Sequence, residues 1–269
     1  MSFKDIIVAE FRFVYADVFR RKAILFMFIT YPYMLTAFIL LIGYSMGSAS
    51  VFMERVGIDP AIFFIVAGFT LMAILGVGDD LLWRPLFDEW MGTLPYVMAS
   101  PVSRIQHYLA IPIPRLIIVL ISGSTSVVPV LIYYYGLQGL YEGLAVIVMT
   151  GIASLMFVTL VMAIMGVVYG MGGENWRIIN VLRPLFLILV GAYYPRYLMP
   201  LAGRIASWII PSSHVIEAIQ RMIAGLVGRP IDILMLLGIA TALFILYAPP
   251  GVKSIIYWEK TKMKEGVKV

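Results

Sequence analysis

Long stretches without a charged residue recur along the chain and constrain its fold more than any other feature. Five of them hold at least 19 residues, at 23–53, 60–78, 116–141, 143–173 and 233–252. A helix needs about 20 predominantly apolar residues to cross the hydrocarbon core of a bilayer. Because backbone polar groups must be paired inside a bilayer, each stretch is expected to be helical. The pattern predicts an all-α integral membrane protein.

The composition agrees with this prediction. Hydrophobic residues make up 62% of the 269 residues and charged residues 13%, whereas a soluble domain is typically about 45–50% apolar and about 25% charged. The mean hydropathy is +0.96. The chain has no cysteine, which excludes disulfides and thiolate metal sites. The N-terminal residues are half polar, so no cleaved signal peptide is expected.

We expect one transmembrane domain, 1–269, with six spans. Its predicted parts are an interfacial helix (3–22), spans one and two (23–78), a cytoplasmic loop (79–104), spans three and four (105–173), span five with a re-entrant segment (176–229), span six (231–252) and a solvated cytoplasmic tail (253–269). Asp79 and Asp80 are expected to end span two at the water. Span three is expected to run from about 105 to 141, and span four from 143.

Residues 3–22 have the pattern of a helix that lies on a membrane surface. Apolar residues recur at helical spacing on one face, at Ile7, Phe11, Val14, Tyr15 and Val18. Charged residues fall largely on the other face, at Asp5, Glu10, Arg12, Asp17 and Arg20. An interfacial helix needs an apolar stripe on one face and charged residues on the opposite face. The alternative is an amphipathic helix packed on a soluble domain, but too little of this chain is soluble to form such a domain.

The distribution of Lys and Arg predicts the orientation. Six spans place both termini on one side, and all but five of the 20 Lys and Arg residues then lie on that side. The exceptions are Arg55, Arg196, Arg204, Arg221 and Arg229. Because positive residues are enriched in cytoplasmic loops, both termini are expected in the cytoplasm. The formal net charge of +5 is thus explained by topology, and no nucleic-acid partner is expected.

The predicted cytoplasmic loop contains the pattern of a short helix. Thr93 can cap a helix that begins at Leu94, and Pro95 suits its first turn because the missing N–H does no harm there. Pro101 is expected to stop this helix after about two turns. The apolar side chains that it would expose are Tyr96, Val97 and Met98. Such a helix suggests docking into a socket of a partner; the alternative is a re-entrant interfacial loop that packs only on its own bundle.

A second pattern lies in the C-terminal third, where two apolar stretches are too short to cross a bilayer. Only 12 uncharged residues separate Arg183 from Arg196, and the next uncharged run, 205–216, is again 12 residues long. Prolines interrupt the region at Pro195, Pro200 and Pro211. We therefore predict a chain that enters the membrane, turns back inside it and leaves by a broken path. Irregular backbone survives at that depth only where protein or water covers it, which favours a transport protein.

Together the two patterns resemble the ABC type-2 exporter permeases. The first match is Glu89 with GTL at 92–94 and SPVSR at 100–104, which is similar to the coupling-helix signature of that family. The second is GAYYP at 191–195, LMP at 198–200, WIIP at 208–211 and Arg221, which is similar to its C-terminal signature. The resemblance covers essentially the whole chain. Pro95 departs from the family pattern, which often has a charged or polar residue there.

The resemblance implies a homodimer or pseudodimer of six-helix subunits, each bound to a cytoplasmic ATP-hydrolysing subunit, with substrate moving outward between the copies. The implied ATPase-coupling residues are Glu89, Thr93, Leu94, Tyr96, Val97, Met98 and Pro101. The expected partners are an ATP-binding cassette subunit, a second copy of the chain and membrane lipids. The sequence GxxxxGK[ST] does not occur, so the chain is expected to be no enzyme and to hold no cofactor. ATP and Mg²⁺ would bind to the partner subunit.

The broken segment is predicted to face the dimer cleft near its outer end and to form an external gate. The candidate gate and path residues are Tyr193, Tyr194, Pro195, Pro200, Pro211, Glu217 and Arg221. Prolines there leave backbone carbonyls without helical partners, and unmet groups are costly in hydrocarbon unless protein or water covers them. Glu217 and Arg221, four residues apart on one helix, are expected to pair. The alternative is a static plug.

Other interpretations stay open. Asp79 and Asp80, with an acidic pair at 88–89, are superficially like the clusters that hold Mg²⁺ in membrane prenyltransferases, but spans three to six contain no second cluster. An uncoupled channel or carrier would usually show a ring of identical charges or a filter sequence. His214 is expected to be a satisfied polar residue and not part of a metal or nucleophile–base site. The tyrosines at 133–135 fit an interfacial aromatic belt, or a surface that stacks on sugar or lipid.

The spans contain few ionisable groups, and this limits the substrate. A hydrophobic or amphipathic compound is expected, such as a drug, a lipid or a lipid-linked glycan. The chain is expected to lie as a multi-pass protein in the plasma membrane of a prokaryote.

Overall fold

The computed structural model describes residues 2–45, 49–170, 175–224 and 230–265, and within these ranges all regular structure is helical. The helices are α1 (Phe3–Val18), α2 (Lys22–Ser45), α3 (Ala49–Val56), α4 (Pro60–Trp90), α5 (Leu94–Ala99), α6 (Arg104–Ala110), α7 (Pro112–Tyr135), α8 (Leu137–Gly170), α9 (Asn175–Leu189), the 3₁₀ turn η1 (Arg196–Leu198), α10 (Leu201–Trp208), α11 (Pro211–Ile223) and α12 (Pro230–Glu265). The all-α prediction is confirmed. Parts of the predicted spans one and two (46–48), of span four (171–173), of the re-entrant segment (225–229) and of the C-terminal tail (266–269) lie outside the described residues.

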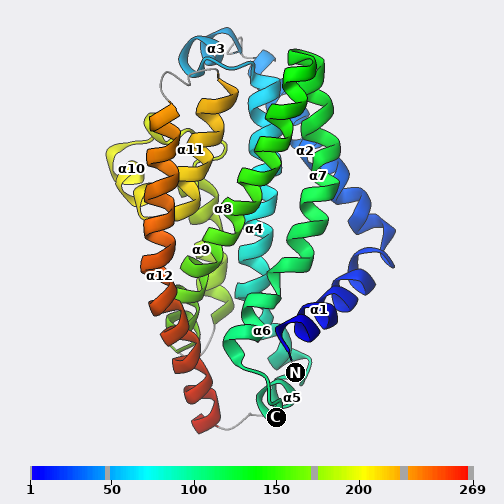
Figure 1. Ribbon diagram of the computed structural model, residues 1–269, viewed down its shortest axis with the longest axis vertical. Helices are drawn as coiled ribbons and strands as arrows, with labels where there is room; N and C mark the ends of the chain where they lie inside the picture. The colour runs from blue at the N-terminus through cyan, green and yellow to red at the C-terminus, as the bar shows by residue number, and fades with distance from the viewer. Residues whose placement is uncertain (1, 46–48, 171–174, 225–229, 266–269) are drawn as a thin grey trace.

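In the part of the chain that the structure describes, five helical segments are long and apolar enough to cross a membrane. They are Lys22–Gly43, Pro60–Trp90, Arg104–Tyr135, Leu137–Tyr169 and Ile231–Lys264. The long helices α2, α4, α7, α8 and α12 pack into one elongated bundle (Figure 1). The predicted fifth span is not among these segments, because α9 ends at Leu189 after 15 residues, which is about 22 Å of helix.

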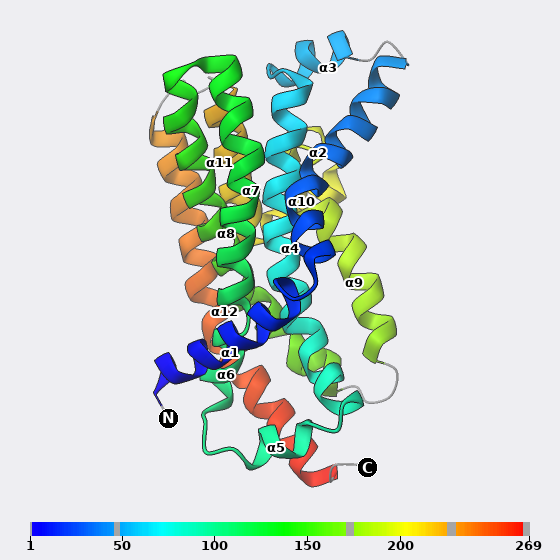
Figure 2. The ribbon, with the colours of Figure 1, turned by 90° about the vertical axis from the view of Figure 1, so that its right-hand side faces the viewer.

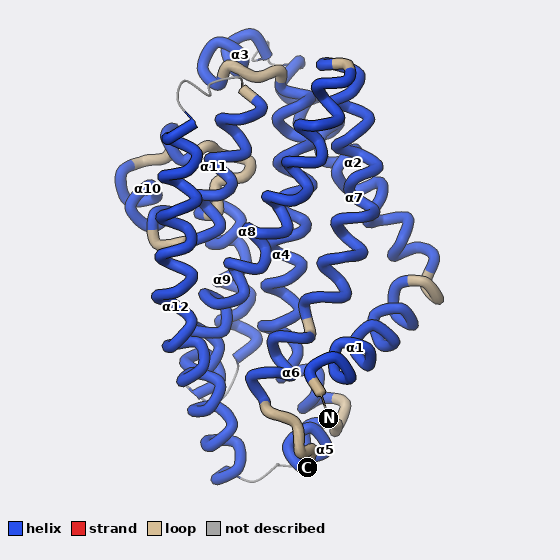
Figure 3. The backbone as a smooth tube through the Cα atoms, in the orientation of Figure 1, coloured by secondary structure: helices blue, strands red, loops and turns tan. Residues whose placement is uncertain are grey.

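The chain passes along the bundle once more in two pieces. In Figures 1 and 2, α9 lies beside the lower half of the bundle and α11 in the upper half, with α10 at nearly the height of α11. The irregular segments on either side of α10 are drawn as loops in Figure 3. With α9 and α11 taken as one broken passage, α1 begins and α12 ends at the same end of the bundle. We call this the terminal end; α3 marks the opposite end.

The helices α4 and α8 form the centre of the bundle. α8 packs against α4, α7, α11 and α12, and α4 also packs against α2, α7 and α9. Glycines allow the closest approaches between these helices. A Cβ on Gly123 of α7 would lie 2.2 Å from the ring of Phe69, and one on Gly78 of α4 would lie 2.7 Å from the ring of Phe157. Small residues at helix interfaces are typical of membrane bundles.

Two predicted helix boundaries are wrong. Asp79 and Asp80 do not end the helix that contains the second span, because α4 continues to Trp90. Both carboxylates are paired with arginines of other helices, which lets the helix run on through them. The third and fourth spans separate at Gly136 and not at 141–143, because Gly136 adopts a positive φ of 63° that ends α7.

The C-terminal segment is not the solvated tail that the sequence predicted. α12 continues to Glu265 through Pro249 and Pro250, and Ser254, Ile255 and Trp258 are buried in it. Trp258 packs edge-on against the ring of Tyr108, at 5.5 Å between ring centroids. The terminal end therefore has an aromatic core of its own.

The N-terminal helix is shorter than predicted and turned about its axis. α1 begins with a capping box between Ser2 and Asp5 and ends at Val18, four residues before the predicted end. It lies across the outside of the bundle near the terminal end (Figure 2). Its buried residues are Ile6, Glu10, Val14 and Val18. Glu10, expected on the polar face, thus points inward.

Candidate functional site

The short helix in the 79–104 loop is present with the predicted bounds. α5 begins at Leu94 with Pro95 in its first turn and ends at Ala99. Thr93 occupies the N-cap position, but its hydroxyl makes no cap hydrogen bond, so this detail of the prediction is wrong. The hydroxyl donates instead to Asp88 Oδ1 at 2.9 Å. Gly92, with a φ of 66°, makes the turn that brings Thr93 back to α4.

The predicted docking surface of α5 is smaller than expected. Tyr96 is 77% exposed, whereas Leu94 is buried at 2%, and Val97 and Met98 are half-buried. The adjoining end of α4 exposes further large apolar side chains, which are Phe87, Trp90 and Met91. Pro101 is exposed just after the helix. Of the three apolar side chains that α5 was predicted to expose, Tyr96 alone is largely exposed.

Polar contacts fasten both flanks of α5. Arg104, buried at the start of α6, donates from Nη2 to the carbonyl oxygens of Met98 at 2.7 Å and Ser100 at 3.1 Å. Glu89, near the end of α4, accepts from Lys262 Nζ at 3.3 Å. The loop is therefore a fixed structure and not a loose tether.

A cluster of charged side chains near the terminal end was missed by the sequence analysis. Arg84 of α4 lies 3.1 Å from Glu10 of α1 and 3.6 Å from Asp88. His107 Nδ1 of α6 lies 3.9 Å from the same Glu10. Burial raises the pKa of Glu10, although the charge of Arg84 opposes this shift. No local pattern could reveal the cluster, because its members come from three separated parts of the chain.

Asp79 and Asp80 are used in ion pairs between helices. Asp80 lies 3.0 Å from Arg115 of α7, which is also 3.6 Å from Asp17 of α1. Asp79 lies 3.0 Å from Arg183 of α9. Among the residues that the structure describes, no group of three or more His, Asp and Glu side chains is arranged to hold a metal ion. The two carboxylates thus link α4 to its neighbours.

The irregular backbone before α10 is covered by a side chain of α11. Gly191, with a φ of 82°, turns the chain after α9. Gln220 Nε2 donates to the carbonyl oxygens of Gly191 at 2.8 Å and Ala192 at 3.1 Å. Arg204 donates to the carbonyl oxygens of Tyr197 at 2.9 Å and, less closely, Met199 at 3.4 Å. Protein groups therefore supply the cover that the sequence argument required.

A buried ion cluster fixes the same region. Arg196 of η1 bonds to Glu217, and its Nη1 lies 3.0 Å from His214 Nδ1. The Nε2 of His214 lies 3.0 Å from the carbonyl oxygen of Trp208, so His214 is buried and paired as expected. The predicted pair of Glu217 and Arg221 is confirmed at 2.6 Å. Arg196, which looked like an exception to the charge pattern, is neutralised inside the protein.

The remaining predicted gate residues do not share one surface. Tyr194 is 46% exposed and its hydroxyl donates to the carbonyl oxygen of Leu198 at 2.7 Å. Tyr193 is half-buried and packs beside Phe64, at 6.3 Å between ring centroids. The predicted gate prolines differ in the same way: Pro195 and Pro211 are buried, and Pro200 is exposed. The structure therefore joins Glu217 and Arg221 to Arg196 but not to one continuous gate face.

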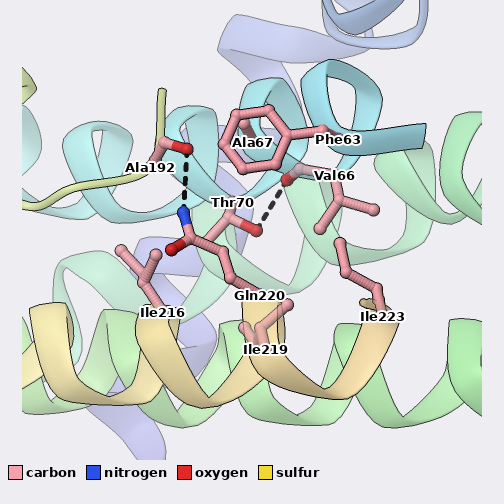
Figure 4. A pocket seen from close by; sticks show the side chains of 9 residues that line it. All are labelled: Phe63, Val66, Ala67, Thr70, Ala192, Ile216, Ile219, Gln220 and Ile223. Carbon is pink, nitrogen blue, oxygen red and sulfur yellow. Dashed lines mark hydrogen bonds between the residues drawn. The ribbon is translucent and has the colours of Figure 1, made fainter. Parts of the chain in front are cut away.

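A small cavity lies between α4 and α11. Its lining is drawn in Figure 4 and consists of Phe63, Val66, Ala67, Thr70, Ala192, Ile216, Ile219, Gln220 and Ile223. Its two polar side chains are engaged, since Gln220 bonds to Ala192 and the Thr70 hydroxyl donates to the carbonyl oxygen of Val66 at 2.7 Å. The volume of about 10 Å³ is barely enough for one water molecule. This cavity cannot hold a substrate.

No protein-family model, curated protein or solved structure matches the chain. Function must therefore be inferred from its own residues and their arrangement.

Proposed function

We propose that this chain is the membrane subunit of an exporter of the ABC type-2 kind, which acts as a homodimer and is driven by ATP hydrolysis on a separate cytoplasmic subunit. The observation that carries the proposal is α5, a short helix fixed at both flanks that projects Tyr96 from the terminal end of the bundle. A docking helix must be rigid and must present a large side chain, and tyrosine is frequent at the energetic centres of interfaces.

The length of α4 supports an aqueous location for α5. The uncharged part of α4, 60–78, is about 28 Å long and matches the hydrocarbon thickness of a bilayer. The next 12 residues, 79–90, extend the helix by about 18 Å. α5 follows directly, so Tyr96 would face water unless a partner covers it. An ATP-hydrolysing subunit is the partner that the sequence resemblance implies.

The substrate path is proposed to lie between two copies of the chain. The cavity between α4 and α11 is water-sized, and the half-length helices α9 and α11 meet in a broken segment that would line the dimer cleft as its outer gate. Few ionisable side chains occur in the apolar parts of the spans. The proposed cargo is therefore hydrophobic or amphipathic, such as a drug, a lipid or a lipid-linked glycan.

The proposed orientation has the terminal end in the cytoplasm and the chain in the plasma membrane. Five lysines and arginines lie within 4–22, which covers α1 and the start of α2, and four more lie in the C-terminal part of α12. α1 begins and α12 ends at that end. The positive-inside rule favours this side as cytoplasmic. With α9 and α11 counted as one broken span, the five long segments give six crossings and place both termini together.

A photocrosslinking residue at position 96 tests the docking proposal. In native membranes, Tyr96→p-benzoylphenylalanine should crosslink to a subunit that also binds a radiolabelled ATP analogue. The matched control is Tyr133, which is 85% exposed at the opposite end of the bundle and should give no such product. Absence of an ATP-binding product from position 96 would overturn the proposed coupling role of α5.

A further inference from the structure

The end of α12 touches both flanks of α5. Glu259 Oε1 accepts a hydrogen bond from Arg104 Nε at 3.1 Å, and Lys262 Nζ donates to Glu89 Oε1 at 3.3 Å. Residues three apart lie on the same face of a helix, so one face of α12 holds the chain just before α5 and just after it. Through these two contacts, α12 bridges the residues that precede and follow α5.

Arg104 carries this contact directly to the backbone of α5. It bonds to the carbonyl oxygens of Met98 and Ser100 with one nitrogen and to Glu259 with another. The last carbonyls of a helix have no partners within that helix and need outside donors. Arg104 is 5% exposed, so this bridge is sheltered from water. The position of α5 therefore depends on a side chain that α12 orients.

The same helix is held along its length by the bundle. Trp258 is fully buried between Tyr108 and Tyr169, at 5.5 and 6.4 Å between ring centroids. Further up, the hydroxyl of Tyr247 donates to the carbonyl oxygen of Ile209 at 3.0 Å, just before α11 begins. From Tyr247 to Lys262, α12 is one continuous helix, about 22 Å long, that includes Pro249 and Pro250. One helix thus contacts both α5 and the broken segment.

We propose that α12 couples the position of α5 to that of the broken segment. Glu259 and Lys262 are the positioning residues that attach the C-terminal part of α12 to the α5 loop. A displacement of α5 would then be passed along α12 to the start of α11. The assignment of α5 as the moving part rests on the proposed function. The attachment of α12 to α5 does not, since it can be measured on the isolated chain.

The first measurement is hydrogen–deuterium exchange on the purified chain. Glu259→Gln together with Lys262→Gln should raise exchange at the amides of 96–100 by about tenfold, because their local opening is no longer opposed. Exchange in α7 should stay unchanged, which separates loss of the tether from general unfolding. Lys260→Gln, an exposed lysine on the same helix, is the matched control and should behave as the wild type. Unchanged exchange in the double variant would overturn the attachment.

The second measurement is made in the complex with its ATP-hydrolysing subunit. The double variant should retain ATP hydrolysis and lose most of its export, since a merely structural defect would lower both together. Glu89→Lys combined with Lys262→Glu restores the pair with reversed charges and should recover protection from exchange beyond either single change. A wild-type ratio of export to ATP hydrolysis in the double variant would contradict the proposed coupling through α12. Faster exchange in a chain that assembles with no ATPase would support the attachment and contradict the proposed function.

Discussion

Arg196 and Glu217 form an ion pair inside the protein, although 21 residues separate them in the sequence. Arg196 is 5% exposed and Glu217 8%. The pair joins η1 to α11 and lies beside His214 and the ring of Trp208. It fixes the course of the chain in the broken segment between α9 and α11.

Removal of Arg196 should destabilise the protein strongly. Arg196→Met leaves Glu217 with only the partly exposed Arg221 as a partner, and breaking a buried pair typically costs about 3–5 kcal/mol. A large fall in the midpoint of thermal unfolding in detergent is expected. The matched control is Arg204→Met, an exposed arginine of α10, which should change the midpoint much less. Equal midpoints for the two variants would show that the buried pair does not stabilise this region.

The sequence predicted the elements that depend on neighbouring residues. The uncharged stretches predicted the long helices, Leu94 and Pro101 bounded α5, and the spacing of Glu217 and Arg221 predicted their pair. Each of these rests on local periodicity, capping or helix geometry. Such signals need no knowledge of the tertiary structure.

The failures share a cause in contacts between distant parts of the chain. Asp79 was expected to end a span, but its charge is met by Arg183, over a hundred residues later. Glu10 was expected in water, but Arg84 draws it inside. Trp258 was placed in a solvated tail because its partners lie on other helices. No window of sequence contains both members of any of these contacts.

The burial of Glu10 should make the stability of the chain depend on pH. Because burial raises the pKa of Glu10, the native chain holds this proton more readily than the unfolded chain, where a glutamate has a pKa of about 4.3. The stabilisation is then fully present below about pH 4.3 and is lost as the pH rises through the native pKa. Arg84 and His107 face the same carboxyl, and the nearby charge of Asp88 also raises its pKa, so these groups affect the pH range of the loss.

Glu10→Gln should therefore reduce the loss of stability between acidic and neutral pH. The measurement is the unfolding midpoint at both values, with Glu54→Gln on the exposed surface of α3 as control. A wild-type pH dependence in Glu10→Gln would contradict the assignment.

The orientation can be tested in this naturally cysteine-free chain. Arg55→Cys in α3 should react with a membrane-impermeant maleimide added to intact cells, because α3 lies at the end proposed to be external. Arg12→Cys in α1, also exposed, should react only after the membrane is opened. Labelling of position 12 in intact cells would reverse the topology.

The gate proposal predicts contact between two copies at Tyr194. Because this side chain is 46% exposed on the broken segment, Tyr194→Cys should form a disulfide-linked dimer. The complex of this dimer with the ATPase subunit should bind ATP but hydrolyse it several-fold more slowly. Tyr133→Cys, 85% exposed near the end of α7, is the control and should stay monomeric. A dimer through position 194 with unchanged turnover would favour a static plug.

The central claim, that this chain is driven by a separate ATPase through α5, is tested most directly by ATP hydrolysis in the complex purified from native membranes. The account predicts that the wild type and Gln106→Asp, an exposed residue of α6, are isolated with an ATP-hydrolysing subunit. Tyr96→Asp should lose at least about tenfold of this activity, as expected for a central tyrosine of an interface. The claim is contradicted if no ATPase activity accompanies the wild-type chain, or if Tyr96→Asp retains all of it.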